Sequence, residues 1–416
     1  MHMLASMVLL WAVAAPPGPL MRQAAGEASP SSCAVCHGQQ GREVGQGAHA
    51  RAGIGCVDCH GGVEGPLDVE PAHAGKLRAL TDRRTTIAVC GGCHANVEQM
   101  RGFGLRTDQA SLYAQSQHGK KLAEDALAEV ATCVTCHGAH QVLPVSDSRS
   151  PVHKTRQVET CGRCHGDEQF ATRYGMRHDM IEGYRRSVHG RALLEEGRIS
   201  SPACTDCHGS HGAAPPRFAD VGLVCGQCHS VVQRYFEQSP HHTAARRGEI
   251  EECVACHRNH AVAEPRAEML LVRDGSVCSP CHGDADDKAR TTAATIYNDL
   301  QKLDRSIAAT DQMLHDAAAR GLFIDEEAGY LDDARSLRIR ARAITHTLST
   351  AALADVLNRG QAMVEETRER MAVKGRAFRD RKIFTAVFFG VVLMFAALLQ
   401  VYRREISGRW TRRRRS

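Results

Sequence analysis

The chain has 416 residues, which is long enough for two or three domains. Only 5% of its residues are aromatic while 37 are glycine, and this composition excludes a large conventional core in the cysteine-rich first two thirds of the chain. The formal net charge of +5 would suit a nucleic-acid partner on charge alone.

The chain opens with a short apolar run, from Leu4 to Ala15, followed by Pro16-Pro17-Gly18-Pro19. This run is too short to span a bilayer but suits the apolar part of a secretory signal peptide. Residues 1–28 are therefore predicted to be a signal peptide, with cleavage near Ala15 or Ala25 as open alternatives. A disordered N-terminal tail is the other interpretation.

Residues 29–284 contain nine copies of the motif Cys-x-x-Cys-His. Two cysteines three positions apart can each form a thioether to one vinyl group of a single haem, and the following histidine then reaches the iron. The predicted attachment cysteines are Cys33, Cys36, Cys56, Cys59, Cys90, Cys93, Cys133, Cys136, Cys161, Cys164, Cys204, Cys207, Cys225, Cys228, Cys253, Cys256, Cys278 and Cys281. The predicted first iron ligands are His37, His60, His94, His137, His165, His208, His229, His257 and His282.

Zinc ligands and redox dithiols are the alternative uses of Cys-x-x-Cys pairs. Neither explains a histidine directly after every pair, and the nine motifs use all 18 cysteines, so none remains for a disulfide or a nucleophile. Nine haems (iron, covalently attached) would supply the missing apolar surface, so this region should be irregular and short-helical, and unfolded without them. Their propionates would bring the net charge to about −13, which argues against nucleic acid.

The motif belongs to a longer repeat, in which one histidine precedes it and another follows it, as His118 and His140 flank the copy at 133–137. The segment from Tyr113 to Gly119 also matches that from Tyr184 to Gly190, which predicts a quasi-linear array of similar haem pairs. The histidines at repeat positions are predicted to be second iron ligands, which would leave no open coordination site. These histidines are His49, His73, His118, His140, His189, His211, His242 and His260.

The repeat provides eight second ligands for nine irons and leaves the haem at His37 without an obvious partner. His153, His178, His241 and His346 are candidates for that position, and a methionine or an open site are further alternatives. The sequence does not determine which second histidine serves which haem. A histidine three residues after a motif is expected to serve a neighbouring haem.

From about Asp286 the composition changes to Ala, Leu, Arg, Asp and Glu, which predicts helices. Apolar residues at heptad spacing run from Ile296 to Ala317 and again from Tyr330 to Ala351, with a stop at Gly321. These two stripes are interpreted as packing faces, and they predict an antiparallel helical hairpin over residues 285–380.

Residues 383–402 carry no formal charge and are long enough to span a bilayer as one helix. A buried soluble helix is the alternative. Both flanks are rich in Lys and Arg, so the positive-inside rule does not orient this segment. The predicted fold class is mainly α with much irregular structure: a haem-packed domain at 29–284, the hairpin and one transmembrane helix.

With nine Cys-x-x-Cys-His motifs, His-Gly ahead of them and Cys-His-Gly-x-His within them, the first 284 residues resemble the bacterial multihaem c-type cytochromes with doubled motifs. The hairpin with a final span is similar to membrane-bound members of this class. The resemblance implies electron transfer along closely packed haems of low potential. It also implies haem attachment outside the cytoplasmic membrane, which places the haem domain in the periplasm, the single span in the inner membrane, and residues 403–416 in the cytoplasm as a basic tail.

Two functions are compatible with these features. The first is an electron carrier between a quinone-linked membrane complex and periplasmic or outer-membrane acceptors of respiration. Its expected partners are redox proteins and a quinone-reactive membrane subunit, because familiar quinol-oxidising cytochromes carry their span at the N-terminus and this chain carries it at 383–402. The alternative is a reductase of nitrite, hydroxylamine or an oxidised sulfur compound with one open haem. All nine motifs end in histidine, which favours the carrier over an enzyme.

Overall fold

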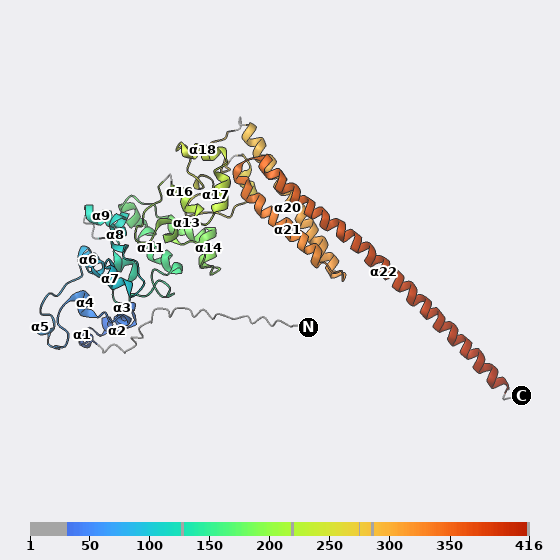
Figure 1. Cartoon of the computed structure of the whole chain (residues 1–416), viewed down its shortest axis with the longest axis horizontal. Helices are drawn as coiled ribbons and strands as arrows, with labels where there is room; N and C mark the ends of the chain where they lie inside the picture. The colour runs from blue at the N-terminus through green and yellow to red at the C-terminus, as the bar shows by residue number, and fades with distance from the viewer. Residues whose placement is uncertain (1–30, 126–128, 218–219, 274, 284–286, 414–416) are drawn as a thin grey trace, which may run out of the picture. The chain divides into compact units, whose positions relative to one another are not determined.

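The computed structural model of this chain describes residues 31–125, 129–217, 220–273, 275–283 and 287–413. The predicted signal peptide, residues 1–28, lies outside this part, and so do residues 414–416 at the end of the basic tail. The regular structure of the described residues is helical and includes no strand (Figure 1). The prediction of a mainly α protein is confirmed.

The chain divides into two compact units, the first made of residues 1–185 and 189–215, the second of residues 186–188 and 216–416. The last three motifs therefore belong to the same unit as the C-terminal helices. The helices up to residue 208 are α1 (Cys33–Cys36), α2 (Gly38–Gln46), α3 (Ala48–Arg51), α4 (Cys56–His60), α5 (Val69–Ala72), α6 (Arg83–His94), α7 (Val97–Arg101), α8 (Gln109–Gln115), α9 (Gln117–Asp125), α10 (Cys133–His137), η1 (Lys154–Arg156), α11 (Gln157–His165), α12 (Glu168–Arg173), α13 (Met180–Arg186), α14 (Val188–Leu194) and α15 (Cys204–His208). The second unit continues with α16 (Val221–Gly226), α17 (Ser230–Phe236), α18 (Pro240–Arg246), α19 (Val254–His257), η3 (Ala267–Leu270), α20 (Asp287–Ala319), α21 (Asp325–Ile344), η4 (Thr345–Thr347) and α22 (Thr350–Arg413).

The Cys-x-x-Cys-His motif forms a single helical turn in α4, α10 and α15. Residues i, i+3 and i+4 of a helix share one face, so both cysteines and the histidine point to the same side. Gly138 and Gly209 then end the turn at φ 82° and 78°, a left-handed conformation that glycine adopts without steric cost. The Cys-His-Gly pattern is thus a helical turn with its stop.

Buried apolar side chains are scattered through the described residues of the first unit. They are Met100, Leu122, Leu143, Val158, Ala171, Leu193 and Ala203. These residues do not form one continuous cluster of the kind found in the second unit. A thin protein core of this sort agrees with the composition of the motif-rich region.

The second unit is organised by α20, α21 and the first part of α22, which contact one another (Figure 1). Their shared core includes Ile296 and Leu303 of α20, Leu331 of α21, and Leu353 and Val364 of α22. The expected two-helix hairpin is therefore incomplete, because a third helix completes the core and then runs on beyond it.

The chain reverses direction between α21 and α22, where the heptad stripe predicts one helix from Tyr330 to Ala351. At this turn Thr345 Oγ1 donates to the carbonyl of Arg342 at 2.7 Å, and Thr347 Oγ1 donates to that of Ile344 at 2.8 Å, contacts that compete with the backbone bonds of a helix. Leu348 then adopts a left-handed conformation with φ 52°. The turn η4 that results carries His346.

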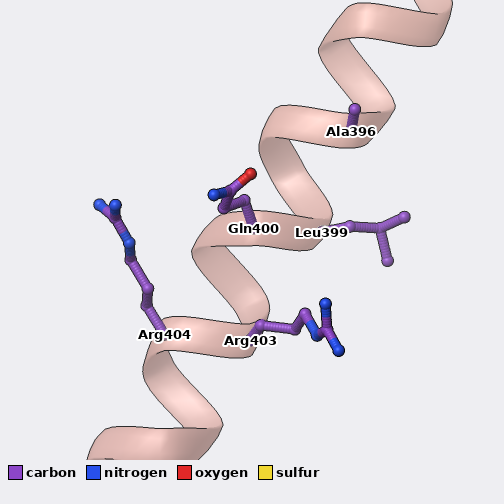
Figure 2. Close-up of a pocket in the computed structure, with 5 residues that line it drawn as sticks. All are labelled: Ala396, Leu399, Gln400, Arg403 and Arg404. Atoms are coloured by element: carbon purple, nitrogen blue, oxygen red, sulfur yellow. The ribbon is translucent and has the colours of Figure 1, made fainter.

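Beyond the bundle, α22 contains a segment that is long and apolar enough to cross a membrane, and none of that segment is buried. The predicted span, residues 383–402, lies within this helix. A surface hollow near its end is lined by Ala396, Leu399, Gln400, Arg403 and Arg404 (Figure 2). All five side chains project from turns of the same helix, so no second element encloses the hollow, and it is not a ligand site.

Candidate functional site

Histidine rings lie opposite one another in pairs, and each pair joins a motif histidine to one outside the motifs. The distances between ring centres are 6.3 Å for His37 and His73, 6.2 Å for His94 and His49, 6.3 Å for His60 and His140, 6.1 Å for His165 and His118, 6.1 Å for His137 and His211, 5.9 Å for His282 and His241, and 6.1 Å for His257 and His346. The distance between ring centres varies little among the seven pairs, which indicates that the pairs have the same function.

The recurring separation fits one metal ion between two imidazoles. Metal–nitrogen bonds of about 2 Å place the two ligating nitrogens about 4 Å apart, and each ring centre lies one ring radius farther out, which gives about 6 Å in total. A direct N–H···N hydrogen bond of about 3 Å would bring the ring centres about 1 Å closer than observed. These side chains therefore fit the two axial positions of a haem iron.

The outer ring nitrogens have partners of the kind that metal-binding histidines use. Nδ1 of His346 donates to the carbonyl of Ala343 at 3.0 Å, and Nδ1 of His208 donates to that of Ala214 at 3.1 Å. Nδ1 of His140 lies 3.3 Å from Oε2 of Glu43. Such bonds fix the ring orientation and leave Nε2 unprotonated and available to a metal.

Burial keeps many of the paired imidazoles neutral, as metal ligands must be. It lowers the pKa of His118, and the nearby His165 adds to this effect. It also lowers the pKa of His257, with smaller contributions from His346 and His229. The same direction and the same first cause apply to His49, His137, His165, His211, His241 and His346.

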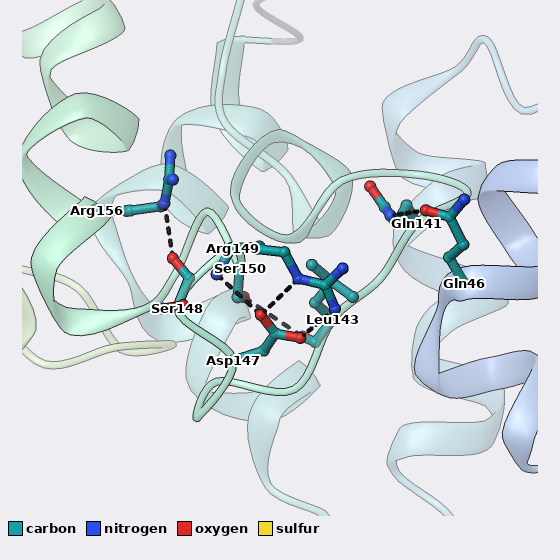
Figure 3. Close-up of polar contacts among 8 residues, drawn as sticks. All are labelled: Gln46, Gln141, Leu143, Asp147, Ser148, Arg149, Ser150 and Arg156. Carbon is teal, nitrogen blue, oxygen red and sulfur yellow. Dashed lines mark hydrogen bonds and ion pairs between the residues drawn. The ribbon is translucent and has the colours of Figure 1, made fainter.

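The loop after α10, whose polar contacts are drawn in Figure 3, carries His140 away from its own motif, and the ring of His140 lies beside that of His60. Several bonds hold this loop: Gln141 Nε2 donates to Gln46 Oε1 at 2.6 Å, and Arg156 Nε donates to the carbonyl of Ser148 at 2.7 Å. Asp147 and Arg149 form an ion pair of 2.7 Å at its tip. A histidine three residues after one motif thus lies beside the histidine of another.

The repeated segment before each motif positions the preceding histidine. In the copy from Tyr113 to Gly119, Ser116 is buried and its Oγ accepts a bond of 3.0 Å from the amide of Gly119, which caps the helix of His118. The hydroxyl of Tyr113 donates to the carbonyl of Ala131 at 2.8 Å, directly ahead of the next motif. Each residue that the copies share therefore has a structural role.

Glycine after that histidine permits a close approach of two helices. A Cβ on Gly119 would overlap the carbonyl oxygen of Tyr113, and one on Gly190 would overlap that of Tyr184. The hydroxyl of Tyr184 donates to the carbonyl of Pro202 at 2.7 Å, as Tyr113 does in its own copy. Glycine thus follows this histidine because a Cβ does not fit there, and not because the backbone needs a left-handed conformation.

The structure differs from the expectation in the copy that contains the His241-His242 doublet, where it brings His241 rather than His242 to a motif histidine. The ring of His242 instead lies edge-on to Phe236, with its Nδ1 3.4 Å from Oε1 of Glu252. Successive residues of a helix point about 100° apart, so only one member of the doublet in α18 can face His282.

The motif histidine His37, for which the sequence repeat offers no partner, lies beside His73, a repeat histidine that was not among its expected partners. Of the expected candidates, His153 caps η1 and its Nδ1 lies 2.8 Å from Thr155 Oγ1, His178 is exposed and His241 is beside His282. His346 is beside His257 instead.

Four further histidines are placed by the helices that carry or flank them. The expected ligand His189 lies in α14, and the expected ligand His260 follows α19. The motif histidine His208 ends α15, and the motif histidine His229 directly precedes α17.

Three pairs of motifs that follow one another in the chain are also neighbours in space. The thiols of Cys90 and Cys133 are in contact, as are those of Cys161 and Cys204, and those of Cys225 and Cys253. The contact with Cys133, together with burial, raises the pKa of Cys90. Groups attached to the two motifs of each of these three pairs would therefore lie next to each other.

Within the described residues, no group of three or more His, Cys, Asp or Glu side chains forms a site for a bare metal ion. No protein-family model, no curated protein and no solved structure matches this chain.

Proposed function

We propose that this chain is a membrane-anchored multihaem c-type cytochrome that transfers electrons between a quinone-linked membrane complex and periplasmic or outer-membrane acceptors. Its haem-bearing region would face the periplasm, residues 383–402 would cross the inner membrane, and residues 403–416 would lie in the cytoplasm. The single observation that carries the proposal is the set of seven histidine pairs, in each of which a motif histidine faces a second histidine at the separation that an iron requires.

The chain itself would contribute attachment, ligation and proximity. Two cysteines per motif would fix each haem, and the helical turn would aim the motif histidine at its iron. The bound haems would supply reversible one-electron chemistry, and two histidine ligands favour a lower potential than a histidine and a methionine. The contacts between successive motifs, such as Cys90 with Cys133, would keep neighbouring haems close enough for electrons to pass along the array.

The reductase alternative requires one iron with an open site. The haem at His37 is the place where the sequence repeat leaves that possibility, and the position of His73 beside His37 supports a closed site there. An electron carrier is therefore favoured over a reductase of nitrite, hydroxylamine or an oxidised sulfur compound.

Electron paramagnetic resonance (EPR) on the oxidised full-length protein tests this function, together with haem quantification and a challenge with nitrite and hydroxylamine. We expect nine covalent haems per chain, all low-spin, with no spectral change on addition of either compound. A high-spin haem that binds nitrite or hydroxylamine would favour the reductase function over the carrier function. A protein without covalent haem would refute both.

A further inference from the structure

The three-helix bundle carries a histidine of its own to a haem motif. His346 lies in η4, between α21 and α22, and its ring centre is 6.1 Å from that of His257. Nδ1 of His346 donates to the carbonyl of Ala343 at 3.0 Å, which fixes the ring and leaves Nε2 available to a metal. No sequence repeat includes His346, and the bundle has no cysteine.

The same end of the bundle is packed against the motif-bearing helices of the second unit. α17 contacts both η4 and α21, and η3 contacts α20. Tyr235 of α17 and Leu270 of η3 pack against the apolar core of the bundle. The bundle and the motif at 253–257 are therefore parts of one packed structure.

The opposite end of the bundle points along α22 toward the apolar segment. α20 runs parallel to α22, since Leu303 is level with Gly360 and Thr310 accepts a bond of 2.8 Å from Arg368. At the far end of the hairpin, Lys374 Nζ lies 3.4 Å from the carbonyl oxygen of Phe323. η4 and the tip of the hairpin are thus at opposite ends of the bundle.

The length of α22 sets the distance between this haem site and the bilayer. From Thr350 to Ile383 the helix is unbroken, and at 1.5 Å per residue this stretch covers about 50 Å. A tilt of about 40°, at the upper end of the usual range, would reduce the height to about 38 Å. The part braced by α20 and α21, from Thr350 to Lys374, alone covers about 36 Å.

We infer that His346 is the second axial ligand of the haem attached at Cys253 and Cys256, and that the bundle is a rigid spacer that holds this haem at least about 36 Å from the bilayer. Electron tunnelling falls exponentially with distance, so a quinone dissolved in the bilayer cannot reduce this haem directly. Its direct electron partners are instead a neighbouring haem of the array, such as the one attached at Cys225, and, outside the chain, a one-electron redox protein whose own centre stands at a similar height. This inference rests on the proposed function.

Ligation is tested in the full-length protein with His346→Ala. We expect nine covalent haems, as in the unchanged protein, but one of them high-spin by EPR. The matched control is His315→Ala, because His315 is exposed on α20 of the same bundle and should leave every haem low-spin. His346→Met keeps a ligand if the alanine variant does not fold, and it should shift the potential of one haem upward in a redox titration.

The outcomes separate the inference from the function on which it rests. If the unchanged protein carries nine low-spin haems and neither His346 variant alters its EPR spectrum or its potentials, His346 is not a ligand and the carrier function still stands. If the unchanged protein carries no haem, the proposed function itself fails.

The spacer is tested in lipid nanodiscs that contain menaquinol. The EPR signal lost in His346→Ala identifies the haem in question, and we expect dithionite to reduce it while menaquinol alone leaves it oxidised over the same time. Addition of a reduced soluble multihaem cytochrome should then reduce it. Rapid reduction by menaquinol alone would overturn the need for a protein partner.

Discussion

The ammonium nitrogen Nζ of Lys374 lies 2.7 Å from Oε2 of Glu327, a carboxylate that is only 1% exposed. Glu327 is in the first turn of α21 and Lys374 is on α22, so this ion pair fastens the tip of the hairpin to the helix that leads to the apolar segment. A buried carboxylate is tolerated only with such a partner.

Lys374→Met should therefore destabilise the bundle. Removing one partner of a fully buried pair costs about 3–5 kcal/mol, and the half-exposed lysine reduces the expected loss here to about 2–3 kcal/mol. Denaturant unfolding of the full-length protein, followed by circular dichroism, measures this loss. Arg376→Met is the matched control, since Arg376 is exposed two positions away on the same helix, and it should change the free energy of unfolding by less than about 0.5 kcal/mol.

The double variant Glu327→Leu with Lys374→Met separates the lost charge partner from lost packing. It should recover most of the stability, because apolar residues of similar volume often replace a buried pair without cost. A double variant no more stable than Lys374→Met would show that the buried charge is not the cause.

His73→Ala should turn one haem of nine high-spin without loss of covalent attachment, because His73 is the ring that faces His37. EPR on the oxidised variant measures this change, and about one ninth of the haem signal should move. The same variant should also gain affinity for nitrite or hydroxylamine at the opened iron.

His153→Ala is the control for this substitution. His153 was an alternative partner for the haem at His37, and its ring caps η1 with Nδ1 2.8 Å from Thr155 Oγ1. The variant should keep every haem low-spin. A high-spin haem in His153→Ala and none in His73→Ala would reverse the assignment.

The spacing of apolar residues predicts much of the helical bundle. The main error is the turn between α21 and α22, and its physical reason lies in the residues at that turn. The stripe from Ile296 to Leu314 becomes the buried face of α20, as predicted. The second stripe continues through Leu348 and Ala351 at helical spacing, yet the chain turns there. Hydroxyl bonds from Thr345 and Thr347 to the preceding carbonyls compete with the helix, and apolar periodicity does not register them.

The motif residues could be read directly, whereas the partner of each motif histidine could not. His346 and His257 are far apart in sequence, and only the packing of α17 against η4 brings their rings together. The prediction of His242 was wrong because the doublet was aligned one residue too far along: Ser239 precedes His241 by two positions, as Ser116 precedes His118, so the repeat itself points to His241. The structure places His241 at the motif histidine His282.

The doublet makes a direct comparison possible. His241→Ala should produce one high-spin haem, because it removes the ring 5.9 Å from His282, while His242→Ala should leave all haems low-spin. His242 packs against Phe236 and lies near Glu252, so its loss should lower stability by about 1 kcal/mol instead. EPR and denaturant unfolding on both variants check the pair, and a high-spin haem in His242→Ala alone would contradict the structure.

Gly119→Ala should disturb both stability and ligation. The added Cβ would overlap the carbonyl oxygen of Tyr113 and lie 2.8 Å from Cα of Ala114, so α8 and α9 must separate. Forced overpacking of this kind costs about 1–3 kcal/mol. Because His118 is the preceding residue, the haem at His165 should also become partly high-spin, as EPR would show.

Gly45→Ala in α2 is the control, since nothing lies within 4 Å of its added Cβ. We expect this variant to gain up to about 1 kcal/mol in the free energy of unfolding from helix propensity. Equal behaviour of the two variants would mean that the close crossing at Gly119 does not position His118.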